Sequence, residues 1–116
     1  AVDALRLEAQ KKGLDDRVDA VVGNAEDPPM GVFDAVLMDP PRAGASKVLL
    51  AIESLRPAMV IYVSCEPTTL ARDARWLVER GWQLARARPY DLFPHTGHVE
   101  TLAVFKGPGY SGRTSI

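Results

Sequence analysis

The sequence predicts an α/β fold in which helices cover a layered sheet. Short apolar runs of strand length alternate with segments of helical periodicity along most of the chain. One such run, residues 59–63, is followed directly by a helix start at residues 67–73. The 116 residues, 47% of them hydrophobic, are enough for one domain with its own core.

The first half of the chain predicts two strands and two helices. Residues 2–13 predict a helix that ends at Gly13, and the chain begins inside this helix without a cap residue, so we expect a start truncated from a longer protein. Strands are expected at 18–22 and 33–38, and the second is apolar enough to be buried on both faces. A helix over 46–55 follows, and Arg56-Pro57 stops it.

The second half predicts the remaining sheet. We expect a strand at 59–63, a helix at 68–80 ended by Gly81, and strands at 82–90 and 99–105 around a loop at 91–98. These last two strands are expected to pair antiparallel. The domain would span residues 1–106, followed by a flexible Gly- and Ser-rich tail at 107–116.

Composition limits the classes of function. The net charge of −1, from 14 basic and 15 acidic residues, gives no global basic field, so any nucleic-acid binding must use local patches. The single cysteine excludes an internal disulfide and a four-cysteine iron–sulfur cluster within this chain. No signal peptide or membrane-length apolar run is visible, so we expect a cytoplasmic setting without membrane contact.

Cys65 is the candidate nucleophile. It lies at the carboxyl end of an expected buried strand and just before a helix start, where ligands collect in α/β sheets. A helix N-terminus favours thiolate over thiol, whereas the neighbouring carboxylate of Glu66 opposes it. The alternative is a small, inert, buried cysteine.

Three further charged residues lie at or near the ends of other expected strands. In Asp39-Pro40-Pro41-Arg42, two prolines make a stiff corner that holds the Asp39 carboxylate at a strand end. There the carboxylate either accepts hydrogen bonds from a ligand or only caps the backbone amides of the turn. Arg42 is either an anion contact or a surface charge. Glu100 lies in a largely apolar strand and is a candidate base, or an exposed charge on an edge strand.

Other polar residues are open to two interpretations. Asn24 is either a turn residue or a ligand contact at a strand end. His95 and His98 lie with Glu100 at a loop-to-strand junction, and their spacing is not that of a familiar zinc site, so we expect no metal.

Three stretches resemble the C-terminal catalytic part of the RNA uracil-5-methyltransferases, above all the enzymes that make 5-methyluridine in bacterial large-subunit ribosomal RNA. They share order and spacing with that family, and the resemblance covers residues 2–106. The stretches are Asp39-Pro40-Pro41-Arg42-Ala43-Gly44, Tyr62-Val63-Ser64-Cys65 with Pro67 and Thr69-Leu70-Ala71-Arg72-Asp73, and Asp91-Leu92-Phe93-Pro94-His95-Thr96-Gly97-His98-Val99-Glu100.

The resemblance implies a Rossmann-like class I S-adenosylmethionine-dependent methyltransferase fold, truncated at its N-terminal side. That fold has the strand order 3-2-1-4-5-7-6, and its first two strands are missing here. We therefore expect an apolar edge beside strand 33–38. Either strand 18–22 moves beside it, or a second copy of the chain covers it in a homodimer, or the segment is poorly ordered.

The resemblance also assigns roles. Cys65 would be the nucleophile and Glu100 the base, and Asn24 and Asp39 would contact the cofactor S-adenosylmethionine. Asp39, Arg42, His95 and His98 would contact the substrate, an RNA that is expected to be ribosomal. Glu66 departs from the family's usual Asn after the cysteine.

Two comparisons narrow the chemistry, and one alternative class remains. RNA cytosine-5-methyltransferases use two active-site cysteines, so one cysteine with a carboxylate favours uracil. Amino-methylating enzymes with an Asp-Pro-Pro-Tyr motif have an aromatic residue where this chain has Arg42.

The alternative to a methyltransferase is a non-catalytic α/β module that binds a nucleotide or a partner, with Cys65 inert. Because the glycine-rich cofactor loop is absent, we expect this piece alone to be weakly active or inactive.

Overall fold

The computed structural model describes residues 2–14, 16–17, 23, 27, 31–93, 98–108 and 110, without the side chains of residues 92, 93 and 98. The described helices are α1 (Val2–Lys11), α2 (Ser46–Leu55) and α3 (Pro67–Glu79). The described strands are β1 (Ala35–Met38), β2 (Met59–Ser64), β3 (Gln83–Phe93) and β4 (His98–Lys106). The expected strand 18–22 and most of the tail 107–116 lie outside these residues.

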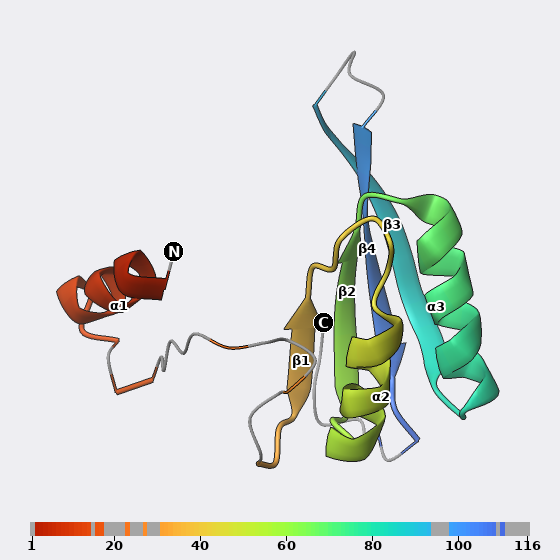
Figure 1. Cartoon of the computed structure of the whole chain (residues 1–116), viewed down its shortest axis with the longest axis horizontal. Coiled ribbons are helices and arrows are strands. Elements are labelled where there is room, and N and C mark those ends of the chain that lie inside the picture. Colours follow the sequence, from red (N-terminus) through yellow and green to blue (C-terminus); the bar gives the residue numbers. More distant parts are fainter. Residues whose placement is uncertain are drawn as a thin grey trace.

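The strands form one four-stranded sheet in the order β1-β2-β4-β3 (Figure 1). β1 and β2 are parallel, and β4 runs antiparallel between β2 and β3. This arrangement matches the 4-5-7-6 half of the strand order that the resemblance implies, and it confirms the antiparallel pairing expected of the last two strands.

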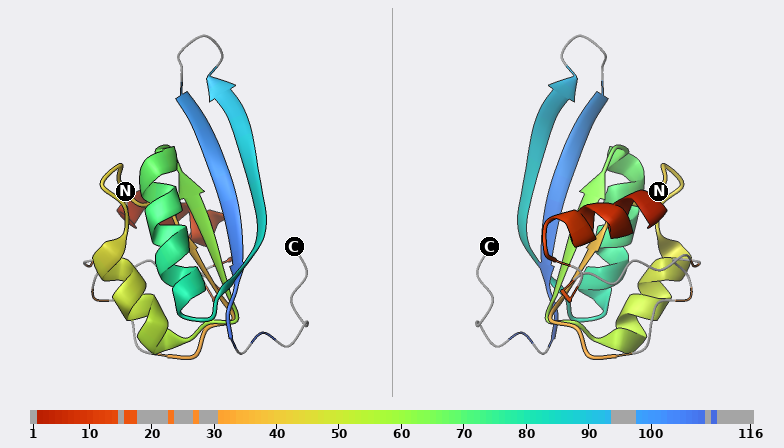
Figure 2. Two further views of the ribbon diagram at one scale, coloured as in Figure 1. Left: turned by 90° about the vertical axis from the view of Figure 1, so that its right-hand side faces the viewer. Right: turned by 90° about the vertical axis from the view of Figure 1, so that its left-hand side faces the viewer.

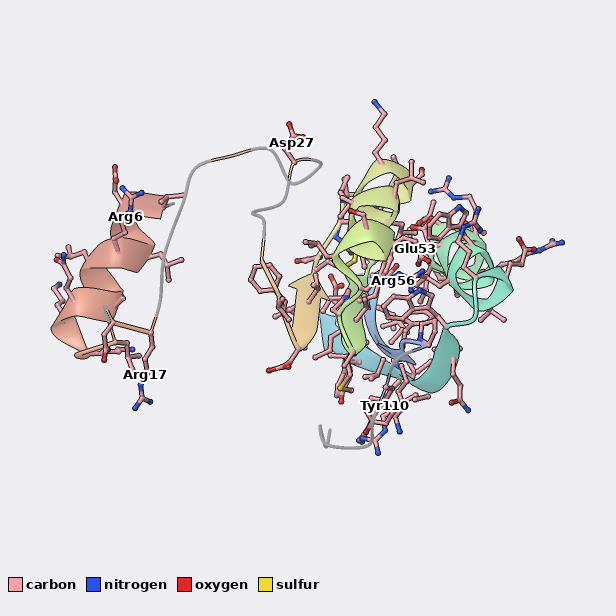
Figure 3. All side chains as sticks on the ribbon, turned by 90° about the horizontal axis from the view of Figure 1, so that it is seen from below. Arg6, Arg17, Asp27, Glu53, Arg56 and Tyr110 are labelled. Atoms are coloured by element: carbon pink, nitrogen blue, oxygen red, sulfur yellow. The ribbon has the colours of Figure 1, made fainter. Side chains whose placement is uncertain are left out.

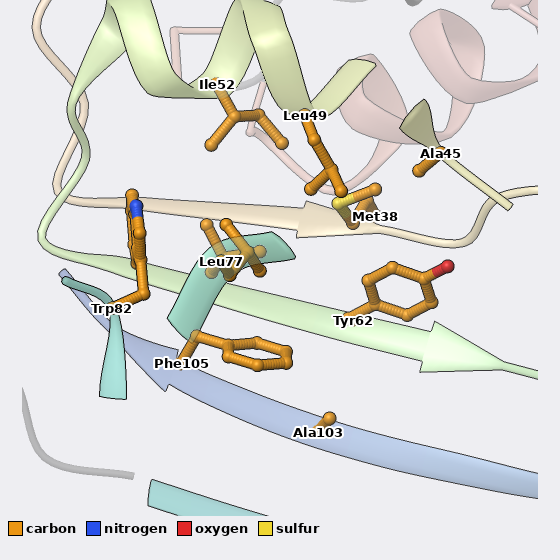
Figure 4. Packing of buried hydrophobic residues seen from close by; sticks show 10 residues of the cluster. Met38, Ala45, Leu49, Ile52, Tyr62, Leu77, Trp82, Ala103 and Phe105 are labelled. Atoms are coloured by element: carbon orange, nitrogen blue, oxygen red, sulfur yellow. The ribbon is translucent and has the colours of Figure 1, made fainter. Parts of the chain in front are cut away.

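Helices α2 and α3 cover the same face of the sheet (Figure 2). Alternate residues of β2 and β4 point to these helices, because successive side chains of a strand face opposite sides. The resulting core contains Met38, Ala45, Leu49, Ile52, Val60, Tyr62, Leu77, Trp82, Ala103 and Phe105 (Figure 4). Trp82 Nε1 donates a hydrogen bond to Glu53 Oε2 over 2.9 Å, which ties the residue before β3 to α2.

Local signals set the helix ends close to the predicted positions. α2 ends where Arg56 takes the left-handed φ of 48° before Pro57, as Arg56-Pro57 predicted. Gly13 and Gly81, with φ of 69° and 90°, follow the ends of α1 and α3. α1 lies apart from the sheet (Figure 1).

The expectation that strand 33–38 is buried on both faces was wrong. β1 is shorter and begins at Ala35. Met38 faces the helices and is 8% exposed, whereas Leu37 faces the other way and is 71% exposed. Among the described residues, β1 pairs with β2 only, so one edge of it has no partner there. Pairing of two copies at this edge stays a prediction.

Candidate active site

Three predicted site residues meet at one edge of the sheet. β1 and β2 are parallel, so Asp39, after Met38, and Cys65, after Ser64, follow strand ends at the same edge. β4 runs the other way and has its beginning there. Its Thr101 pairs with Ser64 in the last step of the β2–β4 ladder. One step further stand Cys65 and Glu100.

Cys65 occupies a turn that hydrogen bonds hold in place. Ser64 is 4% exposed, and its Oγ donates to the Glu66 carbonyl over 2.9 Å and accepts from the Glu66 amide over 3.0 Å. Pro67 begins α3 immediately afterwards. The half-buried thiol is therefore fixed between a strand end and the first turn of a helix.

Glu66 is the N-cap of α3. Its Oε1 accepts hydrogen bonds from Thr68 Oγ1 at 2.7 Å and from the Thr68 amide at 3.3 Å. These bonds lower the pKa of the Glu66 carboxyl, first through the Thr68 side chain and then through its backbone, with a smaller contribution from the positive charge of Arg42. Glu66, where the resemblance led us to expect asparagine, thus caps the helix as asparagine commonly does, through a longer side chain.

Glu100 has a carboxylate oxygen with no structural use in the described part of the chain. The residue is half-buried, and its Oε2 is buried and has no hydrogen-bond partner among the described residues. Buried polar atoms are almost always paired, so an orphaned one at a strand end indicates a function or a missing ligand. On its other side, Glu100 pairs with Tyr90 of β3.

The loop at 39–45, between β1 and α2, is called the Asp39 loop below. A buried carboxylate, for which the sequence predicted no role, holds this loop in place. Asp73 is 2% exposed, and its Oδ2 accepts from Tyr62 OH over 2.6 Å and from the Ala45 amide over 2.9 Å. Arg72 bridges Asp73 Oδ1, at 3.3 Å, and the Ala43 carbonyl, at 2.8 Å. Burial, and then the hydrogen bond to Asp73, raise the pKa of Tyr62. The loop after β1, the middle of β2 and the first half of α3 are thereby joined at one point.

Gly44 allows this close approach. Its φ of 94° is rarely adopted by other residues, and a Cβ there would meet the Arg72 guanidinium and lie 2.9 Å from Asp73 Oδ2.

The buried role of Asp73 had one signal in the sequence. Asp73 is an acid on the apolar face of α3, which Leu70, Ala74 and Leu77 also define.

The residues beside Asp39 fit part of a cofactor site. A groove of about 820 Å³ runs along β1 and α2, within the size range of small-molecule pockets. Its lining is mainly apolar, and the exposed carboxylate of Asp39 lies at its end. This combination suits a ligand with an apolar body and a cationic group.

The structure leaves other predicted residues unplaced or apart. Asn24 and His95 lie outside the described residues, and His98 is described only through its backbone, which pairs with Phe93. Arg42 is exposed on the Asp39 loop, close enough to Glu66 to affect its charge. The described residues contain no group of three or more His, Cys, Asp or Glu side chains that could hold a metal ion. No described helix is long and apolar enough to cross a membrane.

Comparison with known proteins places this fold and these motifs in one class, the RNA methyltransferases that act on uracil. The profile of the tRNA (uracil-5-)-methyltransferase family matches residues 30–106. The chain belongs to that family.

The relatives include two 23S rRNA (uracil(1939)-C(5))-methyltransferases named RlmD. The protein from Yersinia enterocolitica is 56% identical over 73 residues, which make up 63% of this chain and 16% of the relative. The protein from Alkalilimnicola ehrlichii is 47% identical over 111 residues, covering 90% of this chain and 25% of the relative. The chain therefore spans a quarter or less of these two relatives.

A solved structure shares the fold. It is the Pyrococcus abyssi tRNA (uracil-54, C5)-methyltransferase in complex with S-adenosyl-L-homocysteine. The TM-score is 0.67 at 31% sequence identity, over 90% of this chain and 26% of that one. The α/β methyltransferase fold that the resemblance implied is thus confirmed.

Proposed function

We propose that this chain supplies the nucleophile and the base of an RNA uracil-5-methyltransferase, which transfers a methyl group from S-adenosylmethionine to carbon 5 of uridine. The observation that supports it best is the register of β2 and β4, which brings Cys65 and Glu100 to neighbouring positions at the carboxyl edge of the sheet. The names of the curated relatives favour ribosomal RNA as the substrate.

Cys65 would activate the uracil ring. Carbon 5 of uracil is a weak nucleophile, and addition of the thiolate at carbon 6 converts the ring to an enolate whose carbon 5 is reactive. The S–C6 bond forms with the electron pair of the sulfur.

The cofactor would supply an electrophilic methyl group on a sulfonium. Asp39 is suited to hold its cationic part through a charge-assisted hydrogen bond, and the apolar groove along β1 is suited to its uncharged part. Asn24, which the resemblance also assigns to the cofactor, is proposed on that ground alone.

Glu100 would complete the reaction. Once carbon 5 carries the methyl group, its proton must leave before the thiol can be released. The unpartnered Oε2 takes this proton, the electrons of the C–H bond restore the C5–C6 double bond, and the S–C6 bond breaks to regenerate the thiolate. A carboxylate oxygen to which no described residue donates a hydrogen bond is available for this transfer.

The target base must leave its stack to reach a half-buried thiol. Asp39 and Arg42, on the loop after β1, would hold the base or its phosphate at the same edge of the sheet. His95 and His98 are proposed as further substrate contacts from the resemblance.

Covalent trapping tests the proposal. The chain is incubated with S-adenosylmethionine and RNA containing 5-fluorouridine, and its mass is measured. Fluorine at carbon 5 cannot leave as a proton, so a competent site stays attached to the RNA through Cys65. Trapping needs a single turnover, so weak activity of this piece is enough to give an adduct. We expect Cys65→Ala to abolish it and RNA with ordinary uridine not to accumulate it.

Binding controls make a negative result decisive. Calorimetry with S-adenosylmethionine and with the RNA shows whether both are bound under the same conditions. If both bind and no adduct forms, Cys65 is not the nucleophile, and the alternative of a non-catalytic binding module replaces this proposal.

A further inference from the structure

The face of the sheet that points away from α2 and α3 carries a row of basic and aromatic side chains. In β4, Phe105 and Ala103 face the helices, so Lys106, Leu102 and Glu100 face the opposite side. Their neighbours in β3 share that side, since paired residues of adjacent strands do. We call Arg86, Arg88, Tyr90 and Lys106 the basic face.

The basic face runs directly into the candidate site. Tyr90 pairs with Glu100, Arg88 with Leu102 and Arg86 with Val104. Residues two apart in a strand are separated by about 7 Å, so the charges follow one another at even steps away from Glu100. Tyr110, whose ring centre lies 4.6 Å from Lys106 Nζ, is on the same side of the sheet (Figure 3).

The arginines of the basic face are not used in ion pairs within the described part of the chain. The ion pairs found there involve Arg6, Arg72 and Arg75. Arg86 and Arg88 are both exposed, and Arg88 lies 5.4 Å from the ring centre of Tyr90. Two available guanidinium groups beside an exposed aromatic ring suit a partner with phosphates and flat bases.

We propose that the basic face is the path of single-stranded RNA into the site, with phosphates on Arg86, Arg88 and Lys106 and a base stacked on Tyr90. The inference rests on the proposed function for the identity of the partner. It explains how a chain with a net charge of −1 attracts an anionic polymer, because three positive charges lie together on this face. The competing explanation is that charges on β3, an edge strand, only prevent pairing with other chains.

Salt dependence of RNA binding separates the two explanations. The affinity of the whole chain for a fluorescein-labelled single-stranded oligouridylate is measured by anisotropy over a range of salt concentrations. For single strands, each phosphate contact contributes about 0.7 to the slope of log affinity against log salt. We expect the double variant Arg86→Gln/Arg88→Gln to lower that slope by about 1.4 and to weaken binding at every salt concentration.

Two matched variants control for net charge and fold. Arg75→Gln/Arg80→Gln removes the same charge from α3 and from the residue that follows it, on the opposite face of the sheet, and should leave the slope unchanged. Arg86→Lys/Arg88→Lys keeps the charge and should keep the slope. Circular dichroism confirms that each variant is folded.

Each result decides the proposal. An unchanged slope in the Arg86→Gln/Arg88→Gln variant, an equal loss in the α3 control, or no salt-dependent binding by the unsubstituted chain overturns it. If that variant only aggregates more, the edge-protection explanation holds instead. RNA binding is measured without any chemistry, so the two proposals can fail separately. A lowered slope in that variant, together with bound S-adenosylmethionine but no Cys65 adduct, retains the RNA path and rejects the methyltransferase proposal. A Cys65 adduct together with an unchanged slope retains the methyltransferase proposal and rejects the RNA path.

Discussion

Cys65 and Glu100 stand one residue beyond the Ser64–Thr101 pair that ends the β2–β4 ladder. Residues in facing positions of an antiparallel pair have Cβ atoms about 5 Å apart. A planar ring lying over these two side chains would meet the thiol and the carboxylate together. The antiparallel β4 is what makes this possible, since a parallel strand would begin at the other edge of the sheet.

Glu100→Gln should separate the two halves of the reaction. The thiol can still add to the ring and the methyl group can still be transferred, but the proton on carbon 5 has no acceptor. We expect turnover to fall by about 10²- to 10⁴-fold. A covalent protein–RNA species should then accumulate on ordinary uridine, which mass spectrometry detects. Loss of turnover without this species would mean that Glu100 acts before methyl transfer. Glu79→Gln, an exposed change on α3, is the control.

Glu66→Asn should preserve the start of α3 and change how the fold responds to acid. Asparagine is a strong N-cap, so the melting temperature near neutral pH should change little, whereas Glu66→Ala should lower it. The folded-state pKa of Glu66 lies below its ordinary value of 4.5, so its contribution to stability is present above pH 4.5 and is lost as the pH falls through the lowered pKa.

Unfolding by urea at a series of pH values measures this effect. The unsubstituted chain should lose stability on acidification more steeply than Glu66→Asn. Identical acid limbs for the two proteins would show that the hydrogen bonds to Thr68 do not persist in solution. Alkylation rates of Cys65 in the same pair test whether the neighbouring carboxylate also restrains thiolate formation.

Gly44→Ala should destabilise the fold more than Gly81→Ala does. Both glycines have nearly the same φ, 94° and 90°, so the backbone strain of about 1–3 kcal/mol is shared. Only at Gly44 would the new methyl group also meet Arg72 and Asp73, whereas at Gly81 the nearest atom is Pro108 Cγ at 3.4 Å. Equal losses in the free energy of unfolding would mean that the Asp39 loop does not pack on α3 as described.

Much of this architecture could be predicted because its signals are local. α2 begins and ends at the predicted residues since Arg56-Pro57 stops it, and Cys65 was placed correctly between strand and helix. β3 was predicted to end at residue 90 but continues to Phe93, because pairing with β4 outweighs the weak strand preference of Asp91.

The interactions that span the chain could not be predicted in the same way. The hydrogen bond from the Ala45 amide to Asp73 crosses 28 residues, and the one from Tyr62 crosses 11. In the sequence, nothing near Ala45, Tyr62 or Asp73 indicates that these residues contact one another. The exposure of Leu37 could not be predicted for the same reason, because the apolar sequence of a strand does not show which elements pack against it.

Tyr62 should ionise at a higher pH than a free tyrosine. Burial raises its pKa above the ordinary value of about 10, and the Asp73 carboxylate acts in the same direction. Because the folded-state pKa is raised, the stability it contributes is fully present below about pH 10 and is lost as the pH rises through the raised pKa. Absorbance titration of the chain and of Tyr62→Phe isolates this residue, and the variant should show a shallower alkaline loss of stability. A Tyr62 signal at the ordinary pKa would place its hydroxyl in water.

Asp73→Asn should loosen the Asp39 loop as well as destabilise the core. The carboxylate accepts from Tyr62 and Ala45 through one oxygen and from Arg72 through the other, whereas an amide has a single acceptor oxygen and two donors. One side of the network must break, at a cost of about 1.5–3 kcal/mol in the free energy of unfolding. Hydrogen exchange should show faster exchange of the Ala45 amide, while Asp91→Asn, the same change at an exposed position, should leave it unaltered. If Asp73→Asn unfolds more easily but the Ala45 amide stays protected below its melting range, Asp73 stabilises the core without holding the loop. If the amide is released, the weakened loop should also reduce adduct formation at Cys65, because Asp39 and Arg42 would no longer be held at the edge of the sheet.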